Sequence, residues 1–509
     1  MFLLAVLLSF TCILYALSLV RLVRQKRAFA RDIPLHTPKT TFLGMDLTLA
    51  VQNEVERFDL LWQMFWNQDR VFKMLIGPLM CIGVSHPDLM QKVLSHSDCL
   101  EKPFFYDFVQ LENGIFSAKY KLWKSQRKAL NPTFNLRILN SFVPVFVDCS
   151  RRMVAELAKC EDGSTVDMFQ FTSKCTLEMV CATTLGSSVL ERDGKDEFLH
   201  NLEGLFELFA RRMLSIELFP DCIYRMTSYH RRQNMLRRKI DKFAGKIIHE
   251  KRSLHFTHSK IHQLTQPTKD EEDFRKPQIF INQLFSLSNS SRPFTDDEIL
   301  HNVITVMIAG NDTSGLGVAH ACLFLAMYPD IQQKVYAEVM KHFPETEDIE
   351  LNAESLRRLE YTEMFIKECL RHCPVAPTIA RQSLVELELD GFKIPAGNIF
   401  VFSFYALHRR KDIWGLDAEK FDPENFSPER SKDRHPYAFM PFSNGARNCI
   451  GGRYAMLSMK VMIVDIVRNF ELKTELRHCD LKYKFGLTLK LPFAHSIQVF
   501  RRNAETNDQ

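Results

Sequence analysis

Residues 442–451 read FSNGARNCIG and decide more about the fold of this 509-residue chain than any other stretch. Cys449 stands alone on a glycine-rich loop, two residues after Arg447 and directly before a segment rich in helix formers. A thiolate there would lie just before a helix N-terminus, where unpaired N–H groups and the helix dipole favour negative charge. Gly445 and Gly451 would let the backbone turn sharply and approach a flat ligand closely. Arg447 can pair with an anionic group beside that ligand.

Length and composition limit the class of protein. A chain of 509 residues is long for one compact core, so we expect two lobes that share an interface. The low glycine count of 19 and the scarcity of tight-turn signals favour a mainly helical protein. A net charge of +5 is mild, and neither a nucleic-acid motif nor an internal repeat is present, so we expect no nucleic-acid binding. The 13 cysteines are scattered and odd in number, which fits a fold that faces the reducing cytosol.

The N-terminus has the pattern of a membrane anchor. Residues 1–20 carry no charged side chain, and a cluster of arginines and lysine follows at once. About 20 apolar residues can span a bilayer as a helix, and the basic cluster keeps the C-terminal side in the cytosol. A cleaved signal peptide, the alternative, would need a basic start. We therefore expect a transmembrane anchor at 1–21, a basic and proline-containing linker at 22–40 and a catalytic domain at 41–509.

Hydrophobic periodicity predicts many helices and few strands. Helices are predicted at 197–213, 231–251, 330–342, 361–372 and 453–472. Strands are predicted as a hairpin at 72–76 and 79–82, within 385–404, and near the end at 483–491 and 496–500.

A capping box opens a further predicted helix at 296–327. At ~1.5 Å per residue this helix would be roughly 48 Å long, and because it is apolar nearly all round we expect it to be buried. In its middle, residues 309–314 read AGNDTS, and a glycine, an acid and hydroxyls are costly there unless something compensates. Gly310 makes room for a flat cofactor or a small ligand, Thr313 can bond to a carbonyl one turn earlier, and Asp312 can relay protons. Taken alone, the motif is explained as well by a helix kink with a solvated acid.

Two further motifs place charged side chains on helix faces. Glu368 and Arg371 stand at i, i+3, and an exposed pair of this kind would contribute little to stability. Trp123 and Arg127 form W-x-x-x-R on one face of a predicted helix, and Arg381 follows the segment PVAP. Each of these arginines could equally lie on the surface.

Taken together, the motifs resemble the cytochrome P450 family. The loop has the spacing F-x-x-G-x-R-x-C-x-G from Phe442, and W-x-x-x-R, A-G-x-D-T, E-x-x-R and P-E-x-F precede it in family order, so the resemblance covers nearly the whole chain. A buried structural cysteine, the usual fate of a lone Cys, does not explain five matched positions in fixed register. Segments such as 219–225 look most like the microsomal fatty-acid-hydroxylating clan, which includes insect members.

The resemblance implies a fold and an activity. The fold is mainly α with a small β-rich region, behind an N-terminal transmembrane helix in the endoplasmic reticulum membrane, with the catalytic domain in the cytosol. The activity is that of a haem-thiolate monooxygenase, which inserts one oxygen atom of dioxygen into an apolar substrate such as a fatty acid, a lipid hormone, a hydrocarbon or a xenobiotic. The implied cofactor is haem b, with Cys449 as the iron ligand. Ala309 stands where many clan members carry a glutamate that can form an ester to haem, so we expect non-covalent binding.

The resemblance also implies partners. No dinucleotide-binding fingerprint is evident, so electrons from NADPH must arrive through a partner, NADPH–cytochrome P450 reductase, with cytochrome b5 as a second candidate. A basic face would suit an acidic reductase, with an ordinary solvated surface as the alternative. Its candidate residues are Lys119, Lys121, Lys124, Lys128, Arg409, Arg410, Lys411 and Arg453.

Individual residues receive roles in the same way. The residues implied to hold the haem are Trp123, Arg127, Arg381, Phe442, Gly445, Arg447, Cys449 and Gly451. Asp312 and Thr313 would deliver protons during O–O cleavage. Glu368 and Arg371 would lock the region behind the haem, with Asn425 replacing the usual third arginine through an amide hydrogen bond. The candidate substrate-lining residues, for each of which core packing is the alternative, are Val306, Ala309, Gly310, Val375, Ala376, Leu487 and Thr488.

Two other functions stay open at this point. One is a haem-thiolate isomerase or dehydratase, which needs neither dioxygen nor a reductase. The other is a non-catalytic membrane haem-binding sensor. The retained acid and alcohol at 312–313 argue against both.

Overall fold

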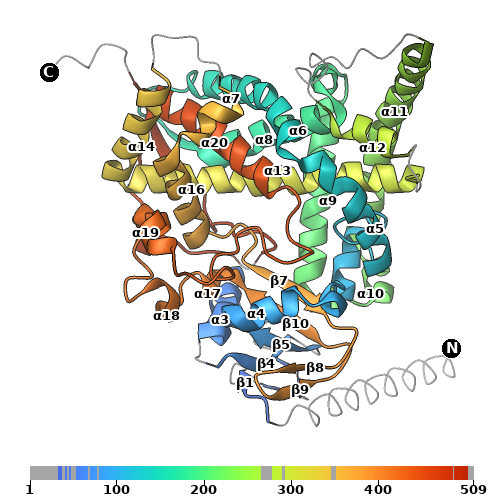
Figure 1. Ribbon diagram of the computed structural model, residues 1–509, viewed down its shortest axis with the longest axis vertical. Helices are drawn as coiled ribbons and strands as arrows, with labels where there is room; N and C mark the ends of the chain where they lie inside the picture. Colours follow the sequence, from blue (N-terminus) through green and yellow to red (C-terminus); the bar gives the residue numbers. More distant parts are fainter. Residues whose placement is uncertain are drawn as a thin grey trace.

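The fold consists of a larger helical body and a smaller body built around a β-sheet (Figure 1). The computed structural model describes residues 32–36, 41–42, 45–46, 53–66, 69–76, 79–264, 278–288, 293–344, 351–484 and 486–502. The mainly helical architecture with a small β-rich region, expected from the sequence, is confirmed. Within these residues no helix combines the length and the apolar character that a membrane span requires. The predicted anchor at 1–21 and most of the linker at 22–40 lie outside them.

The α-helices account for most of the described chain. They are α3 (Glu54–Trp66), α4 (Pro87–Leu94), α5 (Tyr120–Leu130), α6 (Leu136–Ser141), α7 (Val143–Leu157), α8 (Met168–Leu185), α9 (Lys195–Leu214), α10 (Asp221–Met226), α11 (Ser228–Leu264), α12 (Phe280–Ser288), α13 (Asp296–Met327), α14 (Pro329–His342), α15 (Ala353–Arg357), α16 (Glu360–His372), α17 (Phe404–Leu407), α18 (Lys411–Trp414), α19 (Pro428–Ser431) and α20 (Gly452–Asn469).

The strands are short. They are β1 (Leu35–His36), β2 (Thr41–Phe42), β3 (Met45–Asp46), β4 (Val71–Ile76), β5 (Leu79–Val84), β6 (Thr165–Asp167), β7 (Thr378–Gln382), β8 (Leu387–Leu389), β9 (Phe392–Ile394), β10 (Ile399–Ser403), β11 (Phe470–Lys473) and β12 (Ser496–Arg501).

The long helix α13 crosses the whole helical body (Figure 1). Its bounds are those predicted from the sequence, and its capping box is formed: Thr295 Oγ1 accepts the N–H of Glu298, and the Glu298 carboxylate accepts the N–H of Thr295. The helix packs so closely on α8 that a Cβ at Gly310 would lie 2.8 Å from Val180 Cγ2. The prediction that Gly310 makes room for a ligand is therefore wrong in its physical reason, because the missing side chain makes room for α8.

The main sheet has the strand order β1-β4-β5-β10-β7 and brings distant segments together. The predicted hairpin is formed by β4 and β5, β10 runs parallel to β5, and β7 pairs with β10 in antiparallel register, with Arg381 opposite Phe400. A second sheet, β11-β12-β6, packs against α13 of the helical body. The main sheet, through the pairing of β7 with β10, holds Arg381 on a rigid strand.

Two predicted elements differ from the structure. The helix predicted at 453–472 ends at Asn469, because Phe470 begins β11 and pairs with Arg501 of β12. The strand predicted at 483–491 is absent among the residues described there. Its backbone instead bonds to other loops, for example from Leu489 N to the carbonyl of Val375 at 2.9 Å.

Two large hydrophobic clusters share α13. One contains the C-terminal half of α13 together with side chains of α7, α16 and α20, and the other contains its N-terminal half with side chains of α9, α11 and α12. Burial of each large apolar side chain contributes roughly 1.5–3 kcal/mol, so α13 is the element that joins the two halves of the helical body.

Candidate functional site

The cysteine loop is held by its own backbone. Cys449 N donates to the carbonyl of Phe442 at 2.9 Å, and Asn448 N donates to the carbonyl of Gly445 at 3.3 Å. Gly445 has φ +77°, and a Cβ there would collide with the carbonyl of Leu94. Glycine is therefore required at this turn, although the close neighbour that the structure shows is the chain itself.

The Cys449 thiol lies at the start of α20, as predicted. Its side chain has exposed surface, and a Cβ at Gly451 would lie in ordinary van der Waals contact with Sγ, at 3.9 Å. Although part of the side chain is exposed, the protein atoms around the thiol desolvate it, and this raises its pKa. Hydrogen bonds from the N–H groups of Gly451 and Gly452 and the positive charge of Arg127 act in the opposite direction. The helix N-terminus therefore supports a thiolate here, and coordination to a metal deprotonates such a thiol fully.

Three arginines predicted to lie near the cysteine do converge on its loop. Arg127 of α5 donates to Asn448 twice, to its carbonyl at 2.8 Å and to Oδ1 at 2.6 Å. Arg381 of β7 donates to the carbonyl of Arg447 at 3.2 Å. Arg447 donates to the carbonyls of Leu100 and Ala118, the latter at 2.6 Å, and its guanidinium lies 4.9 Å from the ring of Trp123.

A fourth cation, Lys102, joins this group and was missed by the sequence analysis. Its buried ammonium lies 3.8 Å from the ring centroid of Phe116. Burial lowers its pKa well below the usual value, and the charges of Arg447 and Arg381 lower it further. The same two causes, burial and then the charge of Arg381, lower the pKa of Arg447 to about 9. No sequence motif marks Lys102, because only the fold brings it to the loop.

The cation cluster (Lys102, Arg127, Arg381 and Arg447) fits an anionic ligand. In the part of the chain that the structure describes, none of the four forms an ion pair with a carboxylate within 4.0 Å, and the Nε atoms of all three arginines are buried without a hydrogen-bond partner. Buried charges without partners are costly, and two carboxylates would satisfy planar, bidentate donors of this kind. The donor set and the adjacent thiol therefore fit a haem with its two propionates.

The middle of α13 presents an open stripe on an otherwise buried helix. Ala309 is exposed and Val306 and Thr313 are partly exposed, at i, i+3 and i+7 spacing on one face. Thr313 Oγ1 donates to the carbonyl of Ala309 at 2.6 Å, the back-bond that the sequence predicts. Leu487 and Val306 pack against the same hydrophobic cluster as Ile450, the residue after the cysteine. The fold thus brings this stripe and the cysteine loop to one region.

Asp312 is engaged by side chains that the sequence analysis did not connect with it. Its Oδ2 accepts a hydrogen bond from Thr488 Oγ1 at 2.8 Å, and its Oδ1 accepts one from Lys490 Nζ at 2.6 Å. Thr488, predicted to line the substrate pocket, is buried and bonded to the acid instead. Val375 is also buried, in the larger core cluster, while Ala376 beside it is partly exposed.

The pair Glu368–Arg371 forms a buried lock. Arg371 donates to both carboxylate oxygens, at 2.8 and 2.7 Å, and both side chains are fully buried. Although burial raises it, the hydrogen bonds from Arg371 lower the pKa of Glu368 to about 2. Asn425 Nδ2 donates to Glu368 Oε1 at 3.2 Å, which confirms the predicted amide hydrogen bond. The alternative of an exposed surface pair is excluded.

Most residues of the proposed basic face are exposed to solvent. The side chains of Lys119, Lys121, Lys124 and Lys128 on or next to α5 are exposed, as are Lys411 and Arg453. Arg409 is only 3% exposed and donates to the carbonyl of His372 at 2.6 Å. It is therefore a structural residue and not part of this face.

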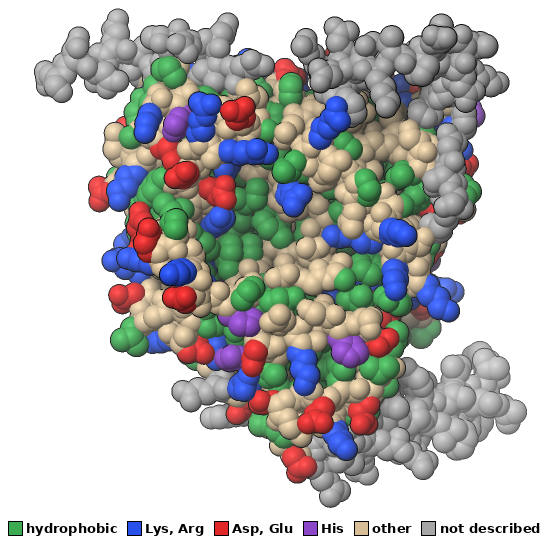
Figure 2. Space-filling view, viewed as in Figure 1, with side chains coloured by type: hydrophobic (Ala, Val, Ile, Leu, Met, Phe, Trp, Pro, Cys, Tyr) green, Lys and Arg blue, Asp and Glu red, His purple; other side chains and the backbone are tan. Residues whose placement is uncertain are grey.

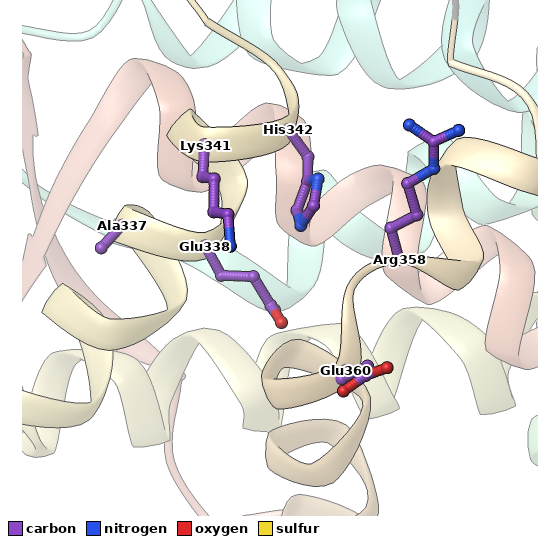
Figure 3. A pocket seen from close by; sticks show the side chains of 6 residues that line it. All are labelled: Ala337, Glu338, Lys341, His342, Arg358 and Glu360. Carbon is purple, nitrogen blue, oxygen red and sulfur yellow. The ribbon is translucent and has the colours of Figure 1, made fainter.

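A hollow of about 540 Å³ lies elsewhere, between α14, α15 and α16 (Figure 3). It is lined by Ala337, Glu338, Lys341, His342, Arg358 and Glu360. The Glu338 carboxylate accepts the N–H groups of Tyr361 and Thr362 at 2.7 and 2.8 Å, so it caps α16. None of the lining residues belongs to α13 or to the cysteine loop, and the hollow has no part in the site.

Comparison with known proteins agrees with this geometry. The family model described as Cytochrome P450 matches residues 37–495. The chain is 29% identical to cytochrome P450 4c21 of Blattella germanica over 91% of this chain and 92% of that protein. It is 30% identical to the probable cytochrome P450 4p3 of Drosophila melanogaster, covering 82% of each chain. It is also 30% identical to the probable cytochrome P450 313b1 of the same species, covering 84% of this chain and 86% of the relative. With its cysteine loop, cation cluster and long central helix, the chain belongs to the cytochrome P450 family.

Proposed function

We propose that this haem-thiolate monooxygenase inserts one oxygen atom of dioxygen into an apolar C–H bond of a lipophilic substrate, using electrons from NADPH delivered by a partner reductase. The observation that carries the proposal is the exposed thiol of Cys449 beside the cation cluster, of which Lys102, Arg381 and Arg447 are buried and Arg127 is half-buried. None of the four cations has a carboxylate partner within ion-pair distance among the described residues. That arrangement suits a cofactor with one soft-ligand metal and two acid groups.

The chain's own residues would hold the cofactor. Cys449 would ligate the iron, Phe442, Gly445 and Gly451 would shape the loop, and Trp123 with the cation cluster would bind the propionates. When bound, haem supplies dioxygen activation, which the electron-rich thiolate ligand favours. The methyl side chain of Ala309 offers no carboxyl for an ester, so the haem b is held without a covalent bond to α13. Intact mass of the purified holoprotein, measured after acid extraction, should equal that of the polypeptide alone.

Protons would come from the middle of α13. The hydroxyl of Thr313 lies on the open stripe and can pass a proton on, because a hydroxyl both donates and accepts. Asp312, the adjacent acid, would bring protons from the solvent side. Delivery of protons by positioned groups of this kind typically contributes a factor of about 10²–10⁴ to a rate.

The substrate would bind against apolar side chains. Val306 and Ala309 on α13, Ala376 before β7 and Leu487 on the C-terminal loop are small or hydrophobic and at least partly exposed. A site of this composition favours a fatty acid, a lipid hormone, a hydrocarbon or a xenobiotic over a charged metabolite. The buried hydroxyl of Thr488 bonds Asp312, so it serves the acid rather than the substrate.

The layout of the chain supports a membrane-bound enzyme. Residues 1–21 have the composition of an anchor and residues 22–40 that of a basic linker, so residues 41–509 would form the catalytic domain on the cytosolic side of the endoplasmic reticulum. NADPH–cytochrome P450 reductase is the electron donor that we propose, with cytochrome b5 as a second one. Expression of full-length chain in microsomes, followed by carbonate extraction and protease protection, tests this placement.

The first test is the carbon-monoxide difference spectrum of the reduced protein. Wild-type chain should bind haem and give the red-shifted band of a thiolate ligand, and Cys449→Ala should abolish that band. Cys479→Ala, at an exposed position on another loop, is the matched control and should keep the band. An unaltered spectrum in Cys449→Ala would overturn the site assignment.

The second test separates the candidate reactions. The protein is reconstituted with reductase and NADPH and offered a panel of lipids and xenobiotics, with ¹⁸O₂ incorporation read by product mass. A monooxygenase yields labelled products that require NADPH. Rearrangement or dehydration of a lipid hydroperoxide itself, without reductase and without oxygen transfer to a second substrate, would instead identify an isomerase or dehydratase, and haem binding without any turnover would identify a sensor.

A further inference from the structure

We propose that Lys490 and Thr488 form a latch on Asp312 which makes proton delivery depend on the position of the substrate-facing loop at 486–490. This inference rests on the proposed role of Asp312 in supplying protons. It adds a positioning residue, Lys490, that no sequence motif assigns.

The latch is visible in the contacts of the acid. Lys490 Nζ donates to one carboxylate oxygen of Asp312 at 2.6 Å, and Thr488 Oγ1 donates to the other at 2.8 Å. Both donors therefore come from one short loop, and both oxygens of the acid are engaged. Adjacent residues on a helix do not face each other, so Asp312 must turn away from at least one donor to pass a proton toward Thr313.

The latch connects the buried helix to solvent. The Asp312 side chain is 10% exposed and that of Lys490 is 40% exposed, so the ion pair bridges the interior and the surface. Other titratable groups face the pair from α9: the charge on Glu203 interacts with both Asp312 and Lys490, and with His200 and Glu207 on its own helix. A released Asp312 would thus meet a polar, solvent-accessible region where water can supply a proton.

The loop is tied to α13 and also touches the apolar region. Leu489 accepts a hydrogen bond from His320 at 2.9 Å, and its N–H donates to Val375 at 2.9 Å. Leu487 directly precedes Thr488 and packs against the hydrophobic cluster that includes side chains of α13. A substrate pressing on Leu487 therefore shifts the residue that bonds Asp312, because the two are neighbours on one constrained backbone.

The proton balance of the step is simple. Asp312 leaves the latch as a carboxylate, takes one proton from hydronium of the bulk solvent, which becomes water, and gives a proton to the Thr313 hydroxyl, which passes its own proton onward. Asp312 is then a carboxylate again and returns to Lys490. No group is oxidised or reduced by the latch itself.

The test compares Lys490→Gln and Thr488→Val with the control Lys482→Gln, an exposed lysine on the same segment, in the full-length holoprotein with reductase. The readouts are NADPH consumption with and without substrate, peroxide release, the pH profile of turnover, and its solvent deuterium isotope effect. We expect both latch variants to keep the thiolate spectrum but to consume NADPH without substrate faster, by about tenfold. Their product yield per NADPH should fall and their pH profile should shift, while Lys482→Gln matches wild type.

Asp312→Asn separates the latch from the proposal on which it rests. If Asp312→Asn lowers product yield and raises the isotope effect but the two latch variants behave like Lys482→Gln, the latch is overturned alone. If Asp312→Asn leaves both readouts unchanged, the proton role of the acid is overturned and the latch with it. Should one latch variant lose its haem, the other still decides the question, because the two act on different oxygens of the acid.

Discussion

At the scale of single residues, Arg447 shows that the positive charges of the cation cluster repel one another and need an anionic ligand. Its guanidinium lies among Arg381 and Lys102, and burial together with the charge of Arg381 lowers its pKa to about 9. We expect Arg447→Met to weaken haem binding by about 10- to 100-fold, the loss of one charge-assisted hydrogen bond of about 1.5–3 kcal/mol. In the haem-free protein, relief of repulsion among the four cations is opposed by loss of the hydrogen bonds to the carbonyls of Leu100 and Ala118, so haem affinity and not melting is the readout.

The measurement is the ratio of haem to protein and the rate of haem transfer to apomyoglobin. Arg453→Met is the control, since Arg453 is exposed one residue into α20 and makes no ion pair among the described residues. If Arg447→Met retained haem as firmly as wild type, the cluster would not be a propionate site.

The residues of the site could be predicted where a motif spans a short stretch of chain. Cys449 and Arg447 share one loop, and Arg127 and Arg381 carry family spacings, so the sequence located all four. Lys102 has no such spacing, and its role depends on tertiary contacts with Phe116 and Arg447. Thr488 was predicted to line the substrate pocket from its position in the chain. Its hydrogen bond to Asp312 could not be predicted, because it depends on how the loop packs on α13.

At the scale of elements, the close contact at Gly310 determines how near α13 lies to α8. A Cβ at Gly310 would lie 2.8 Å from Val180 Cγ2, well inside van der Waals contact. We expect Gly310→Ala to destabilise the protein by about 1–3 kcal/mol, the usual cost of overpacking a core. Thermal melting of the holoprotein measures the loss, and Gly310→Ala combined with Val180→Ala should recover most of it.

Gly245 provides the matched control on α11. No heavy atom outside its local backbone lies within 4 Å of a Cβ built there. Because alanine favours a helix more than glycine does, Gly245→Ala should stabilise the protein by about 0.5–1 kcal/mol. Equal melting shifts in Gly245→Ala and Gly310→Ala would show that helix propensity, and not packing on α8, governs position 310.

The interface between α7 and α20 contains a buried acid, Asp465. Burial raises its pKa to about 6 from an ordinary 3.8, with the Ser150 hydroxyl and the charges of Arg151 and Arg468 opposing the shift. Between these two values the folded state binds more protons than the unfolded state, so this group's contribution to stability falls as pH rises through that window. At pH 7 the penalty is at most about 3 kcal/mol.

We therefore expect Asp465→Asn to melt higher than wild type at pH 7.5, with the difference shrinking as pH falls below 6 toward 5. Asp433→Asn, at an exposed position, should show no such pH-dependent difference. A difference that grew on acidification would mean that the carboxylate of Asp465 is stabilised in the fold, contrary to the structure.

Element boundaries followed from the sequence where local signals were strong. The capping box at Thr295 and the Tyr328–Pro329 end fixed α13 at both ends. The end of α20 was misplaced because Phe470 and Leu472 continue the helical hydrophobic pattern, and only pairing with β12 converts them to strand. The loop at 483–491 has strand-like composition, but its partners are loops and side chains, which no local pattern reveals.

At the scale of the whole molecule, α5 links the surface to the cysteine. Its inner face carries Trp123 and Arg127, which reach the cysteine loop, and its exposed lysines stand at i, i+3 and i+7. Figure 2 shows Lys and Arg side chains gathering over α5, whereas charges of both signs are spread over the rest of this face. A partner that docks on α5 would thus be one helix away from the sulfur, which suits electron transfer.

Reversing the charge of the exposed lysines on α5 tests whether a partner docks there. We expect the triple variant Lys121→Glu, Lys124→Glu and Lys128→Glu to lower reductase-supported turnover by about tenfold or more at low salt, because steering by complementary charge sets the association rate. High salt should narrow the gap, since screening weakens attraction in the wild type and repulsion in the variant. Turnover driven by an organic hydroperoxide, which needs no reductase, should stay at the wild-type rate. The triple variant Arg231→Glu, Arg238→Glu and Lys242→Glu on α11, three exposed positions, is the charge-matched control. A loss of equal size there would show that net charge, not the α5 face, governs docking.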